Sequence, residues 1–339
     1  MKKKIIVIFA LKLISQLAIS QDLMNSIANV KQFVKDIKLE KESVGQKLES
    51  DPNDHLEMTL TLTNTNAKGQ SSVDTYKFNF AFFDLSQIKR DADKKQLAMV
   101  LKTTEGLKAV GVTKNGKADK YTNELTFLCD NADDARELEK ALKEVVTSAK
   151  KSWENSLKLP SDYAGLWNYV KTNMKPFKAQ GIDAQVNTTQ SADFKDRMKV
   201  EFTKTEGKKT EEFAYDFSIG DLAESGLKVD ISGNEVAFTA STTDKAKFIL
   251  AMEGKKVEYS TEARALMASP SDAKKMVLAF QKLVPLARKE LQNRLPKNTN
   301  GSFEGLKQIT SFSQNNKQYD QSITNECVCE YKTGVVEKG

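Results

Sequence analysis

The sequence is poor in the residues that most often carry catalysis. Among 339 residues there is one histidine, His55, and no serine or cysteine near it stands in a recognisable nucleophile motif. A Ser–His–Asp triad needs such an arrangement. Glycine-rich motifs for phosphate or dinucleotide binding are also missing. We therefore predict a protein that is not an enzyme and that holds no cofactor and no metal.

The three cysteines, Cys129, Cys327 and Cys329, are too few for a disulfide-stabilised scaffold. Cys327 and Cys329 stand two residues apart, so on a strand they would share a face, where a disulfide between them would be strained. A Cys-x-Cys pair without a nearby histidine is a weak metal signal. Cys129 is expected to be a buried thiol, and the role of Cys327 and Cys329 stays open.

No run is apolar enough to span a membrane, and the first twenty residues read as an export signal. Three lysines at positions 2–4 precede an interrupted apolar run over residues 5–19, which is too short for a spanning helix. Ala18-Ile19-Ser20 then supplies the small residues that a signal peptidase accepts. We expect cleavage near Ser20 and an exported protein, periplasmic or secreted, without a transmembrane anchor.

An excess of one charge is also missing once the signal is removed. Four of the 52 basic residues leave with it, so 48 remain against 46 acidic ones, a net charge near +2. Both signs are interleaved along the chain, as on an ordinary solvated surface. A nucleic-acid-binding protein should keep a basic excess, so we predict no nucleic-acid partner.

What the chain does contain is a repeated aromatic block. Residues 76–85 read YKFNFAFFDL and residues 213–222 read FAYDFSIGDL, which aligns Asp84 with Asp221 at an offset of 137. A helix-like apolar pattern that starts at Asn131 returns from Ser269 at an offset of 138. Two landmarks that recur in step indicate duplicated domains.

The first unit is expected to open with an amphipathic helix over residues 23–44 that ends at Gly45. Strands follow, with a turn at Asn115-Gly116 before the last of them. Asn131 then caps a helix that runs to about Trp153. The predicted strands cover residues 56–62, 75–82, 96–102, 107–113 and 123–129.

The second unit repeats this order after a helix over residues 163–174. Gly233-Asn234 is predicted to be a two-residue hairpin turn, and Ser269-Pro270 to start a closing helix that ends before Pro296. Pro285 should kink that helix. The predicted strands cover residues 197–203, 212–219, 226–231, 235–240, 247–251, 256–259 and 262–268.

This order predicts a signal peptide over 1–20, a first unit over 21–158, a second over 159–297 and the start of a third over 298–339. A helix is expected near residue 303 and a strand over 324–331. One opening strand cannot form a core alone, so we expect a truncated third unit. The alternative is that this tail adds to an edge of the second unit. Whether the natural chain continues past Gly339 stays open.

Seven short strands followed by one amphipathic helix resemble the pleckstrin-homology-like (PH-like) superfold, and the block ending in Asp-Leu looks like that of secreted bacterial proteins with tandem PH-like units. The resemblance implies an α+β fold of two tandem half-open β-barrels, each with a leading helix. In each, a C-terminal helix plugs one end, here over residues 131–153 and 269–292.

The best-known ligand of the PH-like fold is a phosphoinositide, which alternating basic side chains hold. The first unit offers only Lys68 and Lys77 at the corresponding strands. In the second, acidic residues follow Lys204, Lys208 and Lys209. We therefore predict no phosphoinositide binding.

Four residues are candidates for contact with a partner: Asp84, Asp221, Tyr163 and Trp167. Asp84 and Asp221 are acids repeated at one conspicuous position, although aspartate at such a position more often caps a turn. Tyr163 and Trp167 share a helix face, although such a pair more often packs on a neighbouring element.

We expect an exported, non-catalytic module that binds an unknown protein or peptide, for example by strand addition at an exposed sheet edge. One alternative is a small-ligand or glycan carrier, which would have an apolar or aromatic-lined pocket between the units. The other is a hydrolase whose carboxylates meet between the units.

Overall fold

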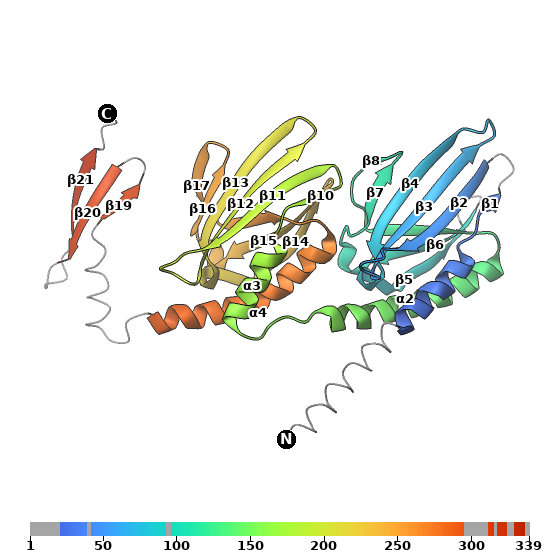
Figure 1. Cartoon of the computed structure of the whole chain (residues 1–339), viewed down its shortest axis with the longest axis horizontal. Coiled ribbons are helices and arrows are strands. Elements are labelled where there is room, and N and C mark those ends of the chain that lie inside the picture. Colours follow the sequence, from blue (N-terminus) through green and yellow to red (C-terminus); the bar gives the residue numbers. More distant parts are fainter. Residues whose placement is uncertain are drawn as a thin grey trace, which may run out of the picture.

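The computed structural model describes residues 21–38, 42–92, 96–294, 311–314, 317–323 and 329–335, with side chains up to residue 290. The predicted signal peptide, the helix expected near residue 303 and Cys327 lie outside these residues. The described chain is a mixed α+β fold built on antiparallel sheets (Figure 1). None of its described helices has the length and apolarity needed to cross a bilayer.

The first unit opens with a helix over residues 21–33 and places its strands in two sheets. The larger sheet has the order β1-β2-β3-β4-β7-β8, and the smaller has the order β5-β6-β9. Helix α2 (Ala132–Ser156) packs on the smaller sheet and closes the unit. The strands are β1 (Ile37–Lys38), β2 (Glu42–Ser50), β3 (Glu57–Asn66), β4 (Ser71–Asn79), β5 (Phe83–Asp91), β6 (Leu97–Thr103), β7 (Gly111–Lys114), β8 (Lys117–Ala118) and β9 (Glu124–Cys129).

The second unit repeats this arrangement element for element. After α3 (Tyr163–Asn173), the larger sheet has the order β10-β11-β12-β13-β16-β17 and the smaller β14-β15-β18, closed by α4 (Pro270–Arg294). The strands are β10 (Phe177–Ala179), β11 (Ile182–Gln190), β12 (Arg197–Glu206), β13 (Lys209–Ser218), β14 (Leu222–Ser232), β15 (Glu235–Thr242), β16 (Ile249–Glu253), β17 (Lys256–Ser260) and β18 (Glu262–Leu266).

A third, three-stranded sheet follows the second unit (Figure 1). It consists of β19 (Ser311–Gln314), β20 (Lys317–Ile323) and β21 (Cys329–Val335) in that order. The first three strands of each full unit, β1-β2-β3 and β10-β11-β12, have the same order. The strand predicted over 324–331 overlaps β21, and its first residues lie outside the described part.

The helix repeat at an offset of 138 is confirmed. The Asn131 side chain accepts hydrogen bonds from the N–H groups of Asp133 and Asp134 at 3.0 and 2.8 Å, and so caps α2. Ser269 starts α4 by accepting from the Asp272 N–H at 3.1 Å and donating to its carboxylate at 2.8 Å. The apolar stripes of both helices are buried: Ala135, Leu138, Ala141, Leu142, Val145, Val146 and Ala149 in α2, and Ala273, Met276, Ala279, Phe280, Leu283, Val284 and Ala287 in α4.

The predicted leading helix over residues 23–44 is wrong in its second half. The helix ends at residue 33, and residues 42–50 form β2, in which Val44, Gln46 and Leu48 are buried in alternation. The Gln46 amide donates to the Leu128 carbonyl at 3.0 Å and accepts from the Leu128 N–H at 2.9 Å, linking β2 to β9. Gln46 is polar although it lies in the buried row, so the sequence does not show the apolar-polar alternation that marks a strand.

The aromatic strand also ends earlier than predicted. β4 stops at Asn79, whose side chain accepts from the Ala81 N–H at 2.9 Å, and residues 80–82 form a 3₁₀ turn. The chain then reverses into β5, which the prediction lacked. Phe80, Phe82 and Phe83 are nevertheless all buried in the core of the first unit.

The strand ladders correct the offset of the aromatic block. Phe78 pairs with Met58, the second residue of β3, and Phe217 pairs with Met198, the second residue of β12. Phe78 is therefore equivalent to Phe217, which gives an offset of 139 instead of 137. Consequently Asp84 and Asp221 do not hold equivalent places: Asp84 lies in β5, while Asp221 closes the 3₁₀ turn before β14.

Other differences concern further strands and one turn. The prediction lacked β1, β2, β8, β10 and β11, and the Asn115-Gly116 turn joins β7 to β8, which returns to the larger sheet, instead of leading to β9. The hairpin turn at Gly233-Asn234 is confirmed between β14 and β15. Cys129 is a buried free thiol, and burial raises its pKa to about 11. Within the described residues, no sheet closes into a barrel.

Candidate functional site

The two units are joined by a junction centred on Tyr121, which follows β8. Its side chain is 8% exposed and belongs to the hydrophobic core of the second unit. The Tyr121 N–H donates to the Gly233 carbonyl in the β14–β15 turn at 2.9 Å. Gln180, in the β10–β11 turn, lies against Gly111 of β7, so closely that a side-chain carbon at Gly111 would clash with its amide. The junction is therefore specific packing between the units.

Beside this junction lies a cleft of about 790 Å³, which we call the interunit cleft. The loop between β2 and β3 and residues of β3, β4 and β7 form its wall in the first unit. The β10–β11 turn and the first turn of α4 form the wall in the second. Its volume falls within the range of roughly 300–1,000 Å³ that small-molecule sites occupy.

A carboxylate connects the two walls of the cleft. Glu57, at the start of β3, accepts a hydrogen bond from the hydroxyl of Ser271, in the first turn of α4. Ser271 is only 4% exposed, and the Asn79 amide lies 3.5 Å from its oxygen as a second donor. Burial raises the pKa of Glu57, the Ser271 hydrogen bond works against that rise, and Asp54 adds to it. Glu57 is thus a desolvated acid held between the units.

The charges that line the cleft are mostly negative. Two of its lysines already have partners: Lys178 pairs with Asp183 at 2.6 Å, and Lys275 lies 5.3 Å from the centre of the Trp153 ring. On the acidic side, Glu49 pairs with Lys47 at 2.8 Å. Five acids against three lysines give the lining a net negative charge, which favours a cationic occupant. The charged lining residues are Glu49, Asp51, Asp54, Glu57 and Asp272 on the acidic side and Lys77, Lys178 and Lys275 on the basic side.

The cleft contains the Glu57 carboxylate, and Ser271 beside it is not an activated nucleophile. The Ser271 hydroxyl donates a hydrogen bond to Glu57, and its low exposure keeps it away from solvent. His55 is exposed in the loop before β3. In the part of the chain that the structure describes, no three His, Cys, Asp or Glu side chains are placed to hold a metal ion.

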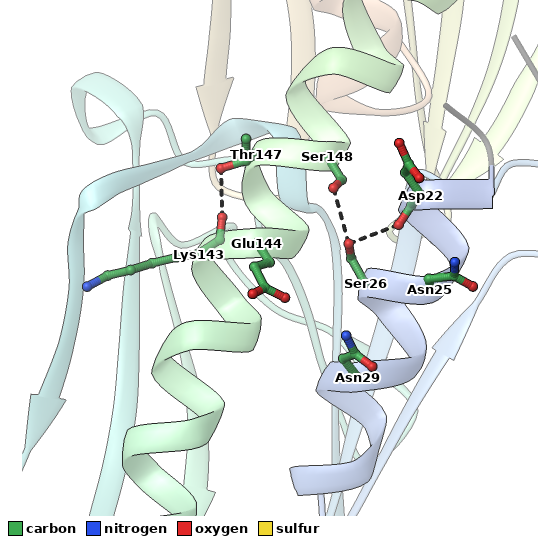
Figure 2. A pocket seen from close by; sticks show the side chains of 8 residues that line it. All are labelled: Asp22, Asn25, Ser26, Asn29, Lys143, Glu144, Thr147 and Ser148. Carbon is green, nitrogen blue, oxygen red and sulfur yellow. Dashed lines mark hydrogen bonds between the residues drawn. The ribbon is translucent and has the colours of Figure 1, made fainter. Parts of the chain in front are cut away.

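A second hollow, of about 490 Å³, lies between the helix over residues 21–33 and α2 (Figure 2). Ser26 donates to the Asp22 carbonyl at 2.9 Å and lies 3.1 Å from the Ser148 hydroxyl, so two small side chains bring the helices together. Figure 2 shows Asn25, Asn29 and Glu144 around this contact. The leading helix therefore braces the closing helix of its own unit, as α3 does with α4.

The aspartates that were predicted to contact a partner have different surroundings. Asp84 accepts from both the N–H and the hydroxyl of Ser86 at 2.8 Å, and these hydrogen bonds lower its pKa. Burial raises the pKa of Asp221, and nearby Asp196 adds to the rise. The structure does not bring the two acids together, and Asp84 makes the local turn contact that aspartate commonly makes.

The aromatic pair on α3 contributes to packing. Trp167 is 9% exposed and belongs to the core of the second unit. The Tyr163 hydroxyl donates to the Lys195 carbonyl in the loop between β11 and β12 at 2.6 Å. Little of the Trp167 side chain is therefore exposed to a partner. Tyr163 is half-buried, so it is the more accessible residue of the pair.

Sequence reasoning missed Glu57, Ser271 and Tyr121, which shape the junction and the cleft. Ser271 was hidden inside the helix-start pattern, and Glu57 looked like one polar position of an alternating strand. The only available sign of Tyr121 was the tyrosine at the matching place of the second unit, Tyr259. No protein-family model, curated protein sequence or solved structure matches this chain.

Proposed function

We propose that this protein is a non-catalytic binding module whose interunit cleft holds a positively charged segment of a protein or peptide. The observation that carries the proposal is a concave space between two units with a desolvated carboxylate, Glu57, at its wall. Asp54 and Asp272 lie close enough to Glu57 to raise its pKa, and Lys275 lies close enough to lower it, so three acids and one lysine act on one region of the cleft.

An arginine or lysine side chain suits this region. A carboxylate can accept about four hydrogen bonds, and Glu57 receives one from the Ser271 hydroxyl. A guanidinium supplies several donors in a fixed planar fork, and an ion pair in a partly desolvated cleft gains more than one on the open surface.

An apolar or glycan ligand fits less well. The aromatic residues that line the cleft, Phe78, Phe82 and Tyr121, are all buried, with no more than 8% of each exposed. Sugar-binding sites offer an open ring face on which the pyranose stacks, and these rings are turned into the cores. The carrier alternative therefore has less support than peptide binding.

We also propose that the protein is exported and that its units are PH-like. Two antiparallel sheets and a closing helix in each unit support the second point. The units differ from the expected barrel plugged by a helix in two ways. Helices α2 and α4 pack on the smaller sheets, and β8 and β17 extend the larger sheets at one edge. Detection of the chain beginning at Gln21 in the medium or periplasm would test export.

A hydrolase is the second candidate, and one observation favours it. Glu57 combines a raised pKa with a place in a concave site, as general acids do. If the protein hydrolyses peptide or glycoside substrates, Glu57→Gln should abolish the activity while the fold persists. Activity that survives this substitution would remove Glu57 from the chemistry.

Calorimetric titration of the full chain with tetra-arginine tests the binding proposal. Asp54→Asn keeps a side-chain oxygen for the Leu56 N–H, which Asp54 now bonds at 3.1 Å, but removes the charge. We expect it to weaken binding about tenfold, since an ion pair in a partly desolvated site is worth about 1–2 kcal/mol. Added salt should weaken binding as well.

Two controls accompany that titration. Glu137→Gln removes an acid from the exposed face of α2, far in sequence from the cleft wall, and should leave the affinity unchanged. Tetra-citrulline has the shape of tetra-arginine without its charge and should not bind. Equal binding of both peptides, or equal losses from the two substitutions, would disprove a specific cationic site in the cleft.

A further inference from the structure

The second unit exposes apolar side chains at one end of its larger sheet. Phe248 and Val257 are each 60% exposed and Tyr259 is 57% exposed. They lie on or beside β16 and β17, and β17 is the edge strand of its sheet within the described residues. An exposed apolar edge strand invites pairing with another chain unless something covers it. We call this surface the β17 face.

The β17 face is the second-unit counterpart of the junction surface of the first unit. Tyr121 precedes Thr122, which bridges to Val110, and Tyr259 precedes Ser260, which pairs with Ile249 at the matching place. The two tyrosines are therefore equivalent. Yet Tyr121 is buried in the core of the next unit, whereas Tyr259 is open to solvent.

The neighbours of the two tyrosines correspond as well. Gly111 lies beside the Tyr121 ring, and Leu250 pairs directly with Tyr259. The Asp54 carbonyl in the cleft wall accepts a hydrogen bond from the Glu57 N–H, and at the matching place in the second unit the Phe194 carbonyl accepts one from the Arg197 N–H. Phe194 is 51% exposed. At two of the three places, the second unit has a larger apolar residue where the first has a polar or small one. The β17 face thus has the composition of a contact surface.

The chain itself supplies the segment that fits this surface. In the first junction, the turn between β10 and β11 lies against β7 and β8. The β19-β20-β21 sheet repeats the order β10-β11-β12. Ala179 pairs with Ile182 in the opening hairpin of the second unit, and Gln314 pairs with Lys317 in that of the later sheet. Figure 1 shows this sheet on the side of the second unit away from the first, the side where β16 and β17 lie.

We propose that the β17 face is the docking surface for the β19-β20-β21 sheet of the same chain, residues 311–335. The paired strands β19 and β20 cover β16 and β17 as the β10–β11 hairpin covers β7 and β8. Tyr259 takes the part that Tyr121 has in the first junction, and the contact between units is repeated along the chain.

Photo-crosslinking in the full chain tests the docking. p-Benzoyl-L-phenylalanine replaces Tyr259, which has room for it because its side chain is largely exposed. After irradiation, mass spectrometry should locate the crosslink within residues 311–335 of the same chain. As a positive control, the same reagent at Ala118, an exposed residue 3.7 Å from the side-chain position at Gly181, should crosslink to the β10–β11 turn.

Each other outcome overturns the proposal. A crosslink between two chains would show that a second copy occupies the β17 face. A crosslink to an added protein or to no residue, while the Ala118 control succeeds, would show that the sheet does not dock there.

Amide hydrogen exchange gives an independent measurement on variants whose folding is not at risk. Val257→Ser/Tyr259→Ser alters only exposed side chains of the second unit. Exchange in residues 317–323 should quicken at least about tenfold, the effect of losing apolar contacts worth about 1.4 kcal/mol or more. Val73→Ser, on an exposed position of β4 in the first unit, is the matched control and should leave this exchange unchanged. Unchanged exchange in the double variant would contradict docking.

Discussion

Substitution of Ser271 by alanine tests the link between the two units. The hydroxyl is the donor that the structure gives to the Glu57 carboxylate, and it lies in the opposite unit. Without it, a desolvated carboxylate loses a hydrogen bond and the Asn79 amide loses an acceptor. A hydrogen bond to a charged group contributes about 1.5–3 kcal/mol, so Ser271→Ala should lower the free energy of unfolding by that amount at a pH where Glu57 is ionised.

The pH dependence of this loss follows from Glu57. Its folded pKa is raised above the unfolded value, mainly by burial, so its contribution to stability is fully present below the unfolded pKa and is lost as pH rises through the folded pKa. Ser271→Ala removes the bond that restrains this rise. The variant should therefore lose most at neutral pH and least in acid, where Glu57 is protonated. Glu57→Gln should flatten the dependence in both backgrounds and stabilise the chain at pH 7.

Urea denaturation at pH 5 and pH 7.5, followed by tryptophan emission, measures these effects. Trp153 belongs to the first unit but lies under Lys275 of the second, so it reports on the junction, whereas Trp167 reports on the second core. Ser218→Ala is the matched control because Ser218 donates to Asp196 at 2.7 Å within one unit. A loss below about 0.5 kcal/mol at pH 7.5, or a loss that grows on acidification, would refute the reasoning.

Three further predictions concern the junction, the helix cap and the buried thiol. Tyr121→Ala should cost about 3 kcal/mol and separate the denaturation curve into two transitions, whereas Tyr121→Phe keeps the buried ring and should preserve a single one. Asn131→Ala should lower the stability of the first unit by about 1 kcal/mol in thermal melts, and Asn131→Asp should keep the cap. Because the pKa of Cys129 is about 11, only about one thiol in a thousand is ionised at pH 8, so peptide mapping should find Cys129 unalkylated in the native chain and alkylated in urea.

The parts of the fold that could be predicted are those with a period that only one structure satisfies. The stripe from Ala135 to Ala149 repeats every three to four residues and begins at a capping asparagine, so α2 and its copy α4 followed directly from the sequence. The aromatic block was less decisive. A slip of two residues leaves an alternating pattern unchanged, so the sequence alignment paired Asp84 with Asp221, and only the strand ladders show the shift.

The remaining errors have local causes. Ile37 and Val44 are seven residues apart and satisfy a helix as well as two antiparallel strands, in which they are paired partners. β8 has only two residues, too few for any period. The cleft could not be predicted because Glu57 and Ser271 are far apart in sequence and meet only when the units dock. Single-residue patterns carry no information about such contacts.

The junction through Tyr121 joins unlike surfaces: the segment after β8 of one unit contacts the β14–β15 turn and the core of the next. Such a head-to-tail contact uses a different surface on each unit, so the same kind of contact can recur along a chain of units. The acidic lining of the cleft is not repeated with the contact, because Arg197 holds the place of Glu57 in the second unit and Phe194 holds that of Asp54. Repetition of the junction would therefore extend the protein without adding a second acidic site of the same composition.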